Sequence, residues 1–153
     1  RNGLQQFLDE NRIAAKIISL PVHTTPVAAA AEALGVSAEQ IIKSLVFRVE
    51  ESPLLVINNG LARVDRKKVA AVMGVGRKRV KFASPEQALS ITGYGVGAMP
   101  PFGHRARLRT IVDAAVMELK EIYGGGGSID AMMQLTPEEL IRVTGAETVE
   151  ISE

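Results

Sequence analysis

The segment from Gly93 to Gly103 restricts the fold of this chain more than any other. Its sequence, GYGVGAMPPFG, places four glycines and two prolines in eleven positions. That composition is incompatible with regular helix or strand, so we predict an irregular loop. The GxGxxA spacing within it matches a dinucleotide-binding fingerprint, but such a fingerprint needs a helix immediately afterwards, and Pro100 and Pro101 prevent one.

Two interpretations of this loop stay open. Its bare backbone N–H groups are suited to meet a ligand carbonyl or phosphate and to form an oxyanion hole. Alternatively, the segment is a tight connection that merely requires glycine. His104 follows the loop, where it would orient a substrate or contact RNA, or else serve as a surface or packing residue.

The rest of the chain alternates short helices and strands without a steady βαβ rhythm. We therefore expect an α+β fold with a mixed, mostly antiparallel curved sheet and helices packed outside it. The length of 153 residues fits a single domain over residues 1–153. Apolar spacing and capping residues predict helices around Leu4–Leu8, at Val27–Leu34 behind a Thr25 N-cap, from Asp65 to Met73, from Ser84 to before Gly93, and from Thr136 to Gly145. Strands are expected at Ile13–Leu20, Ile41–Val49, Leu54–Ile57, around Ile111, up to Leu135 and at Thr148–Ile151, with a hairpin-type turn at Asn59–Gly60.

Composition excludes several kinds of chemistry. There is no cysteine, so disulfide scaffolds, thiolate metal sites and cysteine nucleophiles are ruled out. The chain has only two histidines, His23 and His104, which makes a zinc site or a Ser/His/Asp triad improbable. We expect no metal and no cofactor. No apolar run has the length of a membrane span and no signal pattern is visible, so we expect a cytoplasmic protein.

The net charge of +1 conceals a strong asymmetry. Residues 66–109 contain ten basic residues and one acidic residue, whereas residues 110–153 contain two basic and nine acidic residues. The basic segment is a candidate surface for phosphates, although these charges would also suit ordinary solvated helix faces. The residues expected to contact RNA are Arg77, Lys78, Arg79, Arg105 and Arg107.

Two ionisable residues fall within apolar segments. Strand alternation places Lys43 on the same face as Leu45, Phe47 and Val49, where it either snorkels to solvent or meets an anion at a pocket mouth. Asp113 lies in the stretch IVDA and needs a partner, which Lys43 or a loop N–H could supply.

Five segments together resemble a known family. They are IIKSLVF at 41–47, GAMPPFGH at 97–104, TIVD at 110–113, GGGGS at 124–128 and LTPEELIRVTG at 135–145. The chain is similar over residues 24–146 to the YbaK/ProX superfamily, the free-standing homologues of the editing domain inserted in bacterial prolyl-tRNA synthetase. The resemblance implies a mixed α/β fold with a curved sheet and hydrolysis of mischarged aminoacyl-tRNA in trans.

The resemblance also implies site residues. Lys43 aligns with the essential lysine of the family, Gly97 and Pro101 with its G-x-x-x-P loop, and Asp113 with a typical acidic position. Some members that clear alanine place a histidine late in the sheet, where this chain has glycines. The loop ending Pro-Phe-Gly-His is closer to the ProX-like branch. The amino acid that is removed therefore stays open.

The chemistry of an aminoacyl ester agrees with this role. The ester is already activated, so positioning, an oxyanion hole and a water or substrate hydroxyl suffice. Loop N–H groups around Gly97 would bind the oxyanion, and Lys43 would hold the phosphate or ribose at the acceptor end of tRNA. Met99 and Phe102 would line a small pocket that excludes the cognate amino acid. Further expected substrate contacts are Ser44, Ala98, Pro101, His104 and Asp113.

Other functions remain open at this stage. A non-catalytic module that binds aminoacyl-tRNA or an aminoacyl nucleotide would have the same loop. A regulatory domain would use the basic segment to bind an acidic protein. Besides aminoacyl-tRNA, an aminoacyl-tRNA synthetase is a candidate partner, and the oligomeric state is undetermined by sequence.

Overall fold

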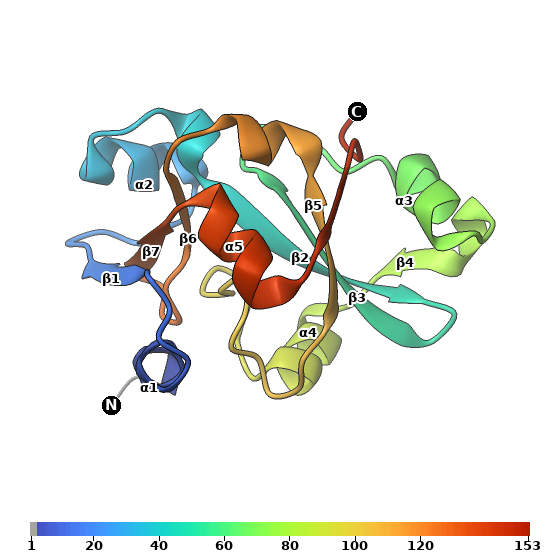
Figure 1. The fold of residues 1–153 in the computed structure, drawn as a ribbon, viewed down its shortest axis with the longest axis horizontal. Coiled ribbons are helices and arrows are strands. Elements are labelled where there is room, and N and C mark those ends of the chain that lie inside the picture. Colours follow the sequence, from blue (N-terminus) through green and yellow to red (C-terminus); the bar gives the residue numbers. More distant parts are fainter. Residues whose placement is uncertain (1–2) are drawn as a thin grey trace.

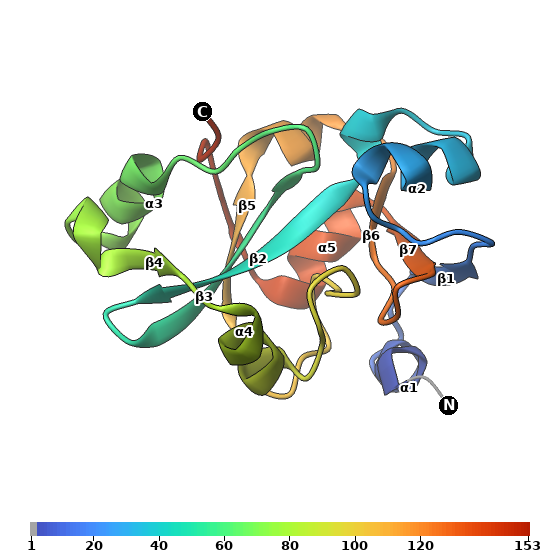
Figure 2. The same cartoon turned by 180° about the vertical axis from the view of Figure 1, so that it is seen from behind.

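The computed structural model describes residues 3–153, which form two β-sheets with helices around them (Figure 1 and Figure 2). The strands are β1 Lys16–Ser19, β2 Ile42–Val49, β3 Ser52–Asn59, β4 Val80–Phe82, β5 Arg109–Asp113, β6 Ile122–Gly125, β7 Ala131–Leu135 and β8 Glu147–Val149. The α-helices are α1 Gly3–Glu10, α2 Val27–Leu34, α3 Arg66–Met73, α4 Pro85–Thr92 and α5 Pro137–Thr144. Short 3-10 helices span Ala38–Gln40 (η1), Arg77–Arg79 (η2) and Ala114–Glu118 (η3).

The larger sheet has the strand order β4-β2-β3-β5-β8, and the smaller one has the order β1-β7-β6. Pairing is antiparallel except for β3 with β5 and β5 with β8, which are parallel. The α+β class is confirmed, but the expected single sheet is divided in two. Within residues 3–153, an isolated bridge between Ile41 and Tyr123 links β6 to the residue before β2, and the glycines that follow in β6 pack against both Ile42 and the loop.

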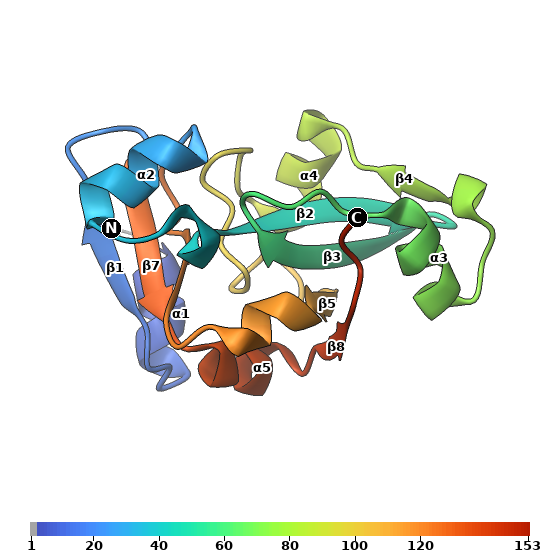
Figure 3. The ribbon, with the colours of Figure 1, turned by 90° about the horizontal axis from the view of Figure 1, so that it is seen from above.

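The faces of the larger sheet bury different clusters. Ile42 and Val46 belong to the main core, the cluster that also contains Leu55, Ile57 and Val112. Phe47 and Val49 point to the opposite face, toward buried residues of α3. Residues of α4, α5 and the loop before β5 all belong to the cluster that contains Ile42 and Val46. Figure 3 shows α4 beside β2 and α5 beside β5 and β8. The loop is thus held between sheet, helices and β6. Among residues 3–153, no helix is both long enough and apolar enough to cross a membrane.

Helix limits follow the predicted capping signals closely. The side chains of Asp65, Ser84 and Thr136 each accept a hydrogen bond from an N–H in the first turn of α3, α4 and α5. The Thr25 cap was wrong, because Pro26 occupies the N-cap position of α2 and makes no side-chain cap.

The prediction of a hairpin-type turn at Asn59–Gly60 was also wrong. The β2–β3 hairpin turns at Glu50 and Glu51, both with positive φ angles. The Asn59 side chain instead accepts hydrogen bonds from the N–H groups of Leu61 and Ala62, which directs the chain away from β3 toward α3.

One carboxylate ties the N-terminal part of the chain to α5. Glu139 accepts a hydrogen bond from the N–H of Ala14 at 2.7 Å and two from the Arg142 guanidinium, each at 2.7 Å. These bonds lower the pKa of Glu139 from 4.5 to about 2, and the bonds from Arg142 are the largest cause. Because the folded-state pKa is depressed, the stabilisation is complete above pH 4.5 and is lost as the pH falls toward 2.

We therefore expect Glu139→Gln to lower the free energy of unfolding by about 1 kcal/mol at pH 7. The difference from the parent protein should shrink as the pH falls from 4.5 to 2. Denaturant titrations across this range measure it. Glu138→Gln, an exposed change in the same first turn, is the control, and an equal effect of both changes would contradict the role of Glu139.

Candidate active site

The loop between α4 and β5 is fixed through its carbonyl groups. The Thr24 hydroxyl donates to the carbonyl of Gly97 at 2.9 Å, and the N–H of Gly127 donates to that of Ala98 at 3.0 Å. His104 Nε2 lies 2.7 Å from the carbonyl of Pro100. Three groups from outside residues 97–100 thus hold three carbonyls of the loop.

The amides of the same loop are differently placed. The N–H groups of Gly97 and Met99 donate to no acceptor among residues 3–153. Gly97 has a φ angle of +93°, a conformation that favours glycine. Carbonyls that are occupied and amides that are available give the loop a local preference for negatively charged groups, as an oxyanion hole requires.

The glycine run of β6 allows the loop to approach the sheet. A Cβ atom added at Gly125 would lie 2.1 Å from the carbonyl oxygen of Met99. One added at Gly124 would lie 3.3 Å from both Ile42 and Pro101 side-chain atoms. The loop proline and the residue preceding Lys43 therefore meet at the same point of β6.

Lys43 is half-buried near the start of β2, opposite Asn58 of β3. Burial lowers the pKa of its ammonium group, and the nearby charge of Arg63 lowers it further. Neither cation has a carboxylate partner among residues 3–153. Two neighbouring cations without an acid form a site for an anion. Ser44 points to the other face of the sheet, and its buried hydroxyl oxygen has no hydrogen-bond partner in the described part of the chain.

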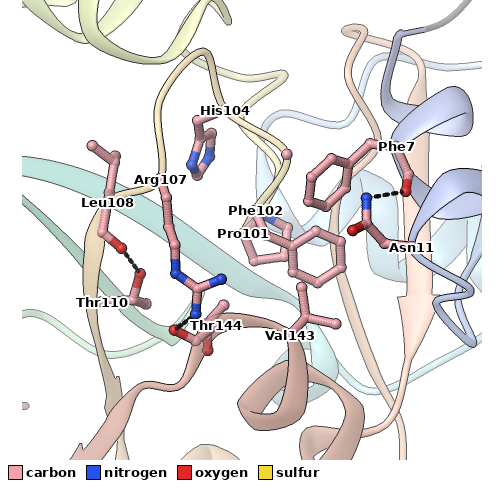
Figure 4. Close-up of a pocket in the computed structure, with 11 residues that line it drawn as sticks. Phe7, Asn11, Pro101, Phe102, His104, Arg107, Leu108, Thr110, Val143 and Thr144 are labelled. Carbon is pink, nitrogen blue, oxygen red and sulfur yellow. Dashed lines mark hydrogen bonds between the residues drawn. The ribbon is translucent and has the colours of Figure 1, made fainter.

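The other predicted loop residues face elsewhere. Ala98 and Met99 are buried, with Met99 in the main core. Pro101, Phe102 and His104 line a cavity toward α1 and α5, shown in Figure 4. The predicted substrate residues are therefore divided between the two sides of the loop.

Asp113 has different partners from those expected. It is 2% exposed, and its carboxylate accepts hydrogen bonds from the N–H of Ile151 and the hydroxyl of Ser152, each at 3.0 Å. Ser152 also lies 3.3 Å from the Asn58 amide nitrogen. Asp113 thus fastens the C-terminal segment to the sheet, and neither Lys43 nor a loop N–H is its partner. Nowhere in residues 3–153 do three His, Asp or Glu side chains gather closely enough to hold a metal ion.

The predicted RNA-binding residues are only partly available. Arg77 and Lys78 are exposed in η2, while Arg79 forms an ion pair with Glu50. Arg105 and Arg107 each donate to a backbone carbonyl, of Ser90 and Thr144 respectively.

Sequence reasoning missed Thr24 and Arg63. Thr24 is buried directly before the Thr25–Pro26 bond, and its only signal was a hydroxyl residue beside a helix start. Arg63 lies outside residues 66–109, so the basic composition of that segment did not indicate it. The β2–β3 pairing, which sets Lys43 opposite Asn58, brings the following turn and Arg63 near the lysine.

Comparison with known proteins places these features in a family context. A family model described as an aminoacyl-tRNA editing domain matches residues 21–143. The uncharacterized protein YwhH of Bacillus subtilis is 33% identical over 112 residues, which cover 72% of this chain and 69% of that protein. A candidate Cys-tRNA(Pro)/Cys-tRNA(Cys) deacylase, EbsC of Enterococcus faecalis, is 26% identical over 80% of this chain and 74% of its own length.

A solved structure agrees with these sequence relatives. It is described as a candidate trans-editing enzyme for prolyl-tRNA synthetase and superposes with a TM-score of 0.92 at 32% identity, covering 99% of this chain and 95% of that one. The proline–tRNA ligase of Thermodesulfovibrio yellowstonii is 34% identical over 60% of this chain, which amounts to 15% of the ligase.

The packing of β6 predicts a sharp difference between two glycine substitutions. Gly125→Ala should lower the free energy of unfolding by at least about 2 kcal/mol, because the new Cβ would overlap the Met99 carbonyl and force the backbone apart. Gly76→Ala is the control, since its Cβ would meet nothing within 4 Å and its φ angle of −73° suits alanine. Its effect should stay within about 0.5 kcal/mol. Equal stabilities in thermal or denaturant unfolding would refute the close approach.

Proposed function

Since the chain belongs to the aminoacyl-tRNA editing domain family, we propose that it is a deacylase that hydrolyses the ester bond of mischarged aminoacyl-tRNA in trans. The observation that carries this proposal is the loop of residues 95–101, in which the carbonyls of Gly97, Ala98 and Pro100 accept hydrogen bonds. The amides of Gly97 and Met99 donate to no acceptor in the described residues. A loop of this kind stabilises the negative charge that develops on an ester carbonyl under attack.

The reaction needs no covalent group from the protein. A water molecule, which the 2′-hydroxyl of the terminal adenosine can orient, attacks the ester carbon and gives up a proton, and the loop amides bind the resulting oxyanion. Collapse of the tetrahedral intermediate breaks the bond to the ribose 3′-oxygen, which leaves with a proton. The ester is already activated, so positioning and charge stabilisation supply most of the acceleration.

Lys43 and Arg63 would hold the terminal phosphate of the acceptor end. Both cations lack a carboxylate partner in the described residues, and a phosphodiester supplies the missing negative charge. In this role Lys43 binds and orients the substrate without becoming a nucleophile.

The tRNA is proposed to be tRNA-Pro or a related tRNA that carries the wrong amino acid. Support comes from the names of the relatives, which include proline–tRNA ligases and a candidate deacylase for Cys-tRNA(Pro). Residues 124–127 of this chain are all glycine, so no side chain in that run reaches the substrate. Selection among small amino acids would then depend on pocket size.

The decisive experiment incubates the purified protein with a panel of mischarged tRNAs and follows the release of labelled amino acid. Hydrolysis of at least one mischarged tRNA, with correctly charged tRNA left intact, is expected. Tight binding without turnover on every member of the panel would instead identify a non-catalytic aminoacyl-tRNA module.

The Lys43→Ala change is expected to leave the protein folded and to lower kcat/KM by about 100-fold or more, because the substrate phosphate no longer meets an ammonium group. Lys43→Arg keeps the charge at that position and should be less impaired. Single-turnover deacylation measures both variants, and circular dichroism verifies folding. An unchanged rate in Lys43→Ala would remove the lysine from the site.

A second prediction concerns how RNA is held. Replacing Arg77, Lys78 and Arg79 together by alanine should reduce the salt dependence of tRNA binding by roughly 0.7–0.9 in the log–log slope for each phosphate that these side chains neutralise in the parent protein. Hydrolysis of a minimal aminoacyl-adenosine should remain nearly intact, because that substrate does not extend to η2. Lys120→Ala, in the acidic C-terminal part, is the control. Equal impairment on tRNA and on the minimal substrate would contradict a separate RNA surface.

A further inference from the structure

The cavity lined by Pro101, Phe102 and His104 lies on the side of the loop that faces α1 and α5 (Figure 4). It has a volume of about 170 Å³ and is not used by the proposed deacylation. Its walls come from α1, from the loop residues after Pro100, from the start of β5 and from the end of α5. The residues that matter for its chemistry are Phe7, Phe102, His104, Arg107, Val143 and Thr144.

One wall of this cavity is apolar and largely aromatic. The rings of Phe7 and Phe102 have centroids 6.0 Å apart with planes inclined by 32°. Figure 4 shows these rings and Val143 on one side of the cavity and the Arg107 guanidinium on the other. Such a wall offers contact to a planar hydrocarbon body.

The opposite wall carries a single available cation. Arg107 donates one hydrogen bond, to the Thr144 carbonyl at 3.0 Å, and has no carboxylate partner among residues 3–153. A guanidinium has five N–H donors, so most of its capacity is unused. No lining residue is acidic. A carboxylate is the group that such a planar donor binds best in two-point fashion.

His104 adds no second charge. Its Nε2 must carry the proton, because the Pro100 carbonyl 2.7 Å away can only accept. Burial lowers the pKa of the ring, although the bond to the Pro100 carbonyl opposes this shift, and the lowered pKa favours the neutral form. The cavity therefore balances one negative charge and not two.

We propose that this cavity binds a small monocarboxylate with a flat apolar body. Its volume agrees with that assignment, since an apolar cavity of roughly 150 Å³ admits a benzene ring. An amino acid with a free ammonium group fits poorly, because no lining acid would pair with that charge. The proposal stands independently of the deacylase activity.

Benzoate is the probe for this site, with benzamide as the neutral isostere and acetate as the charge without the ring. Calorimetry at pH 7 should give benzoate a Kd of about 1 mM or tighter, a modest value for a ligand of this size. Benzamide and acetate should bind at least tenfold more weakly. In nitrogen–proton NMR correlation spectra, the amide chemical shifts that change when benzoate is added should belong mainly to residues 101–110 and 143–144. Equal binding of all three compounds, no binding of benzoate, or shifts elsewhere would each overturn the proposal.

A matched pair of variants tests whether the guanidinium of Arg107 binds the carboxylate. Arg107→Gln should weaken benzoate binding by tenfold or more, whereas Arg105→Gln should leave it unchanged, because the Arg105 side chain bonds to the Ser90 carbonyl and does not line the cavity. If both variants bind benzoate like the parent protein, the guanidinium of Arg107 is not the carboxylate site. The comparison of benzoate with benzamide on the parent protein tests the same point without any substitution.

Discussion

The hydrogen bonds to the carbonyls of the loop are the interactions on which the rest of this structure depends. A segment rich in glycine and proline has no ladder of its own, so its order must come from outside. Thr24, Gly127 and His104 supply it from before α2, after β6 and from the loop end. The amides of Gly97 and Met99 donate to no acceptor among residues 3–153, and in the proposed function they bind the oxyanion.

The glycine run of β6 is the second feature that positions the loop. Contact between Gly125 and the Met99 backbone requires a strand without a side chain at this point. A side chain here would separate the loop from the sheet. In the proposed function, the chemistry of the site is left to the backbone and to the cations Lys43 and Arg63, which suits an activated ester better than a less reactive bond.

Local signals predicted the local structure well and long-range pairing poorly. Asp65 and Ser84 mark their helices because a cap is decided within four residues. The alternation that puts Lys43 on one face of β2 is equally local. The partners of Asp113 could not be read in this way, since Ile151 and Ser152 are 38 and 39 residues distant. The strand in the glycine run was missed because glycine has no side chain whose pattern could indicate it.

The distribution of charge in the folded protein also differs from what the sequence alone suggests. In residues 66–109, the structure engages Lys68 with Glu150, Arg79 with Glu50 and Arg109 with Glu147. The basic side chains that keep no acidic partner in residues 3–153 include a group on α3, η2 and β4: Arg66, Lys67, Arg77, Lys78 and Lys81. Arg63 precedes this group along the chain and lies near Lys43. Positive charge without an acidic partner in the described residues is therefore found at Lys43 and Arg63 and on α3, η2 and β4, a smaller set of residues than the net charge of the segment suggests.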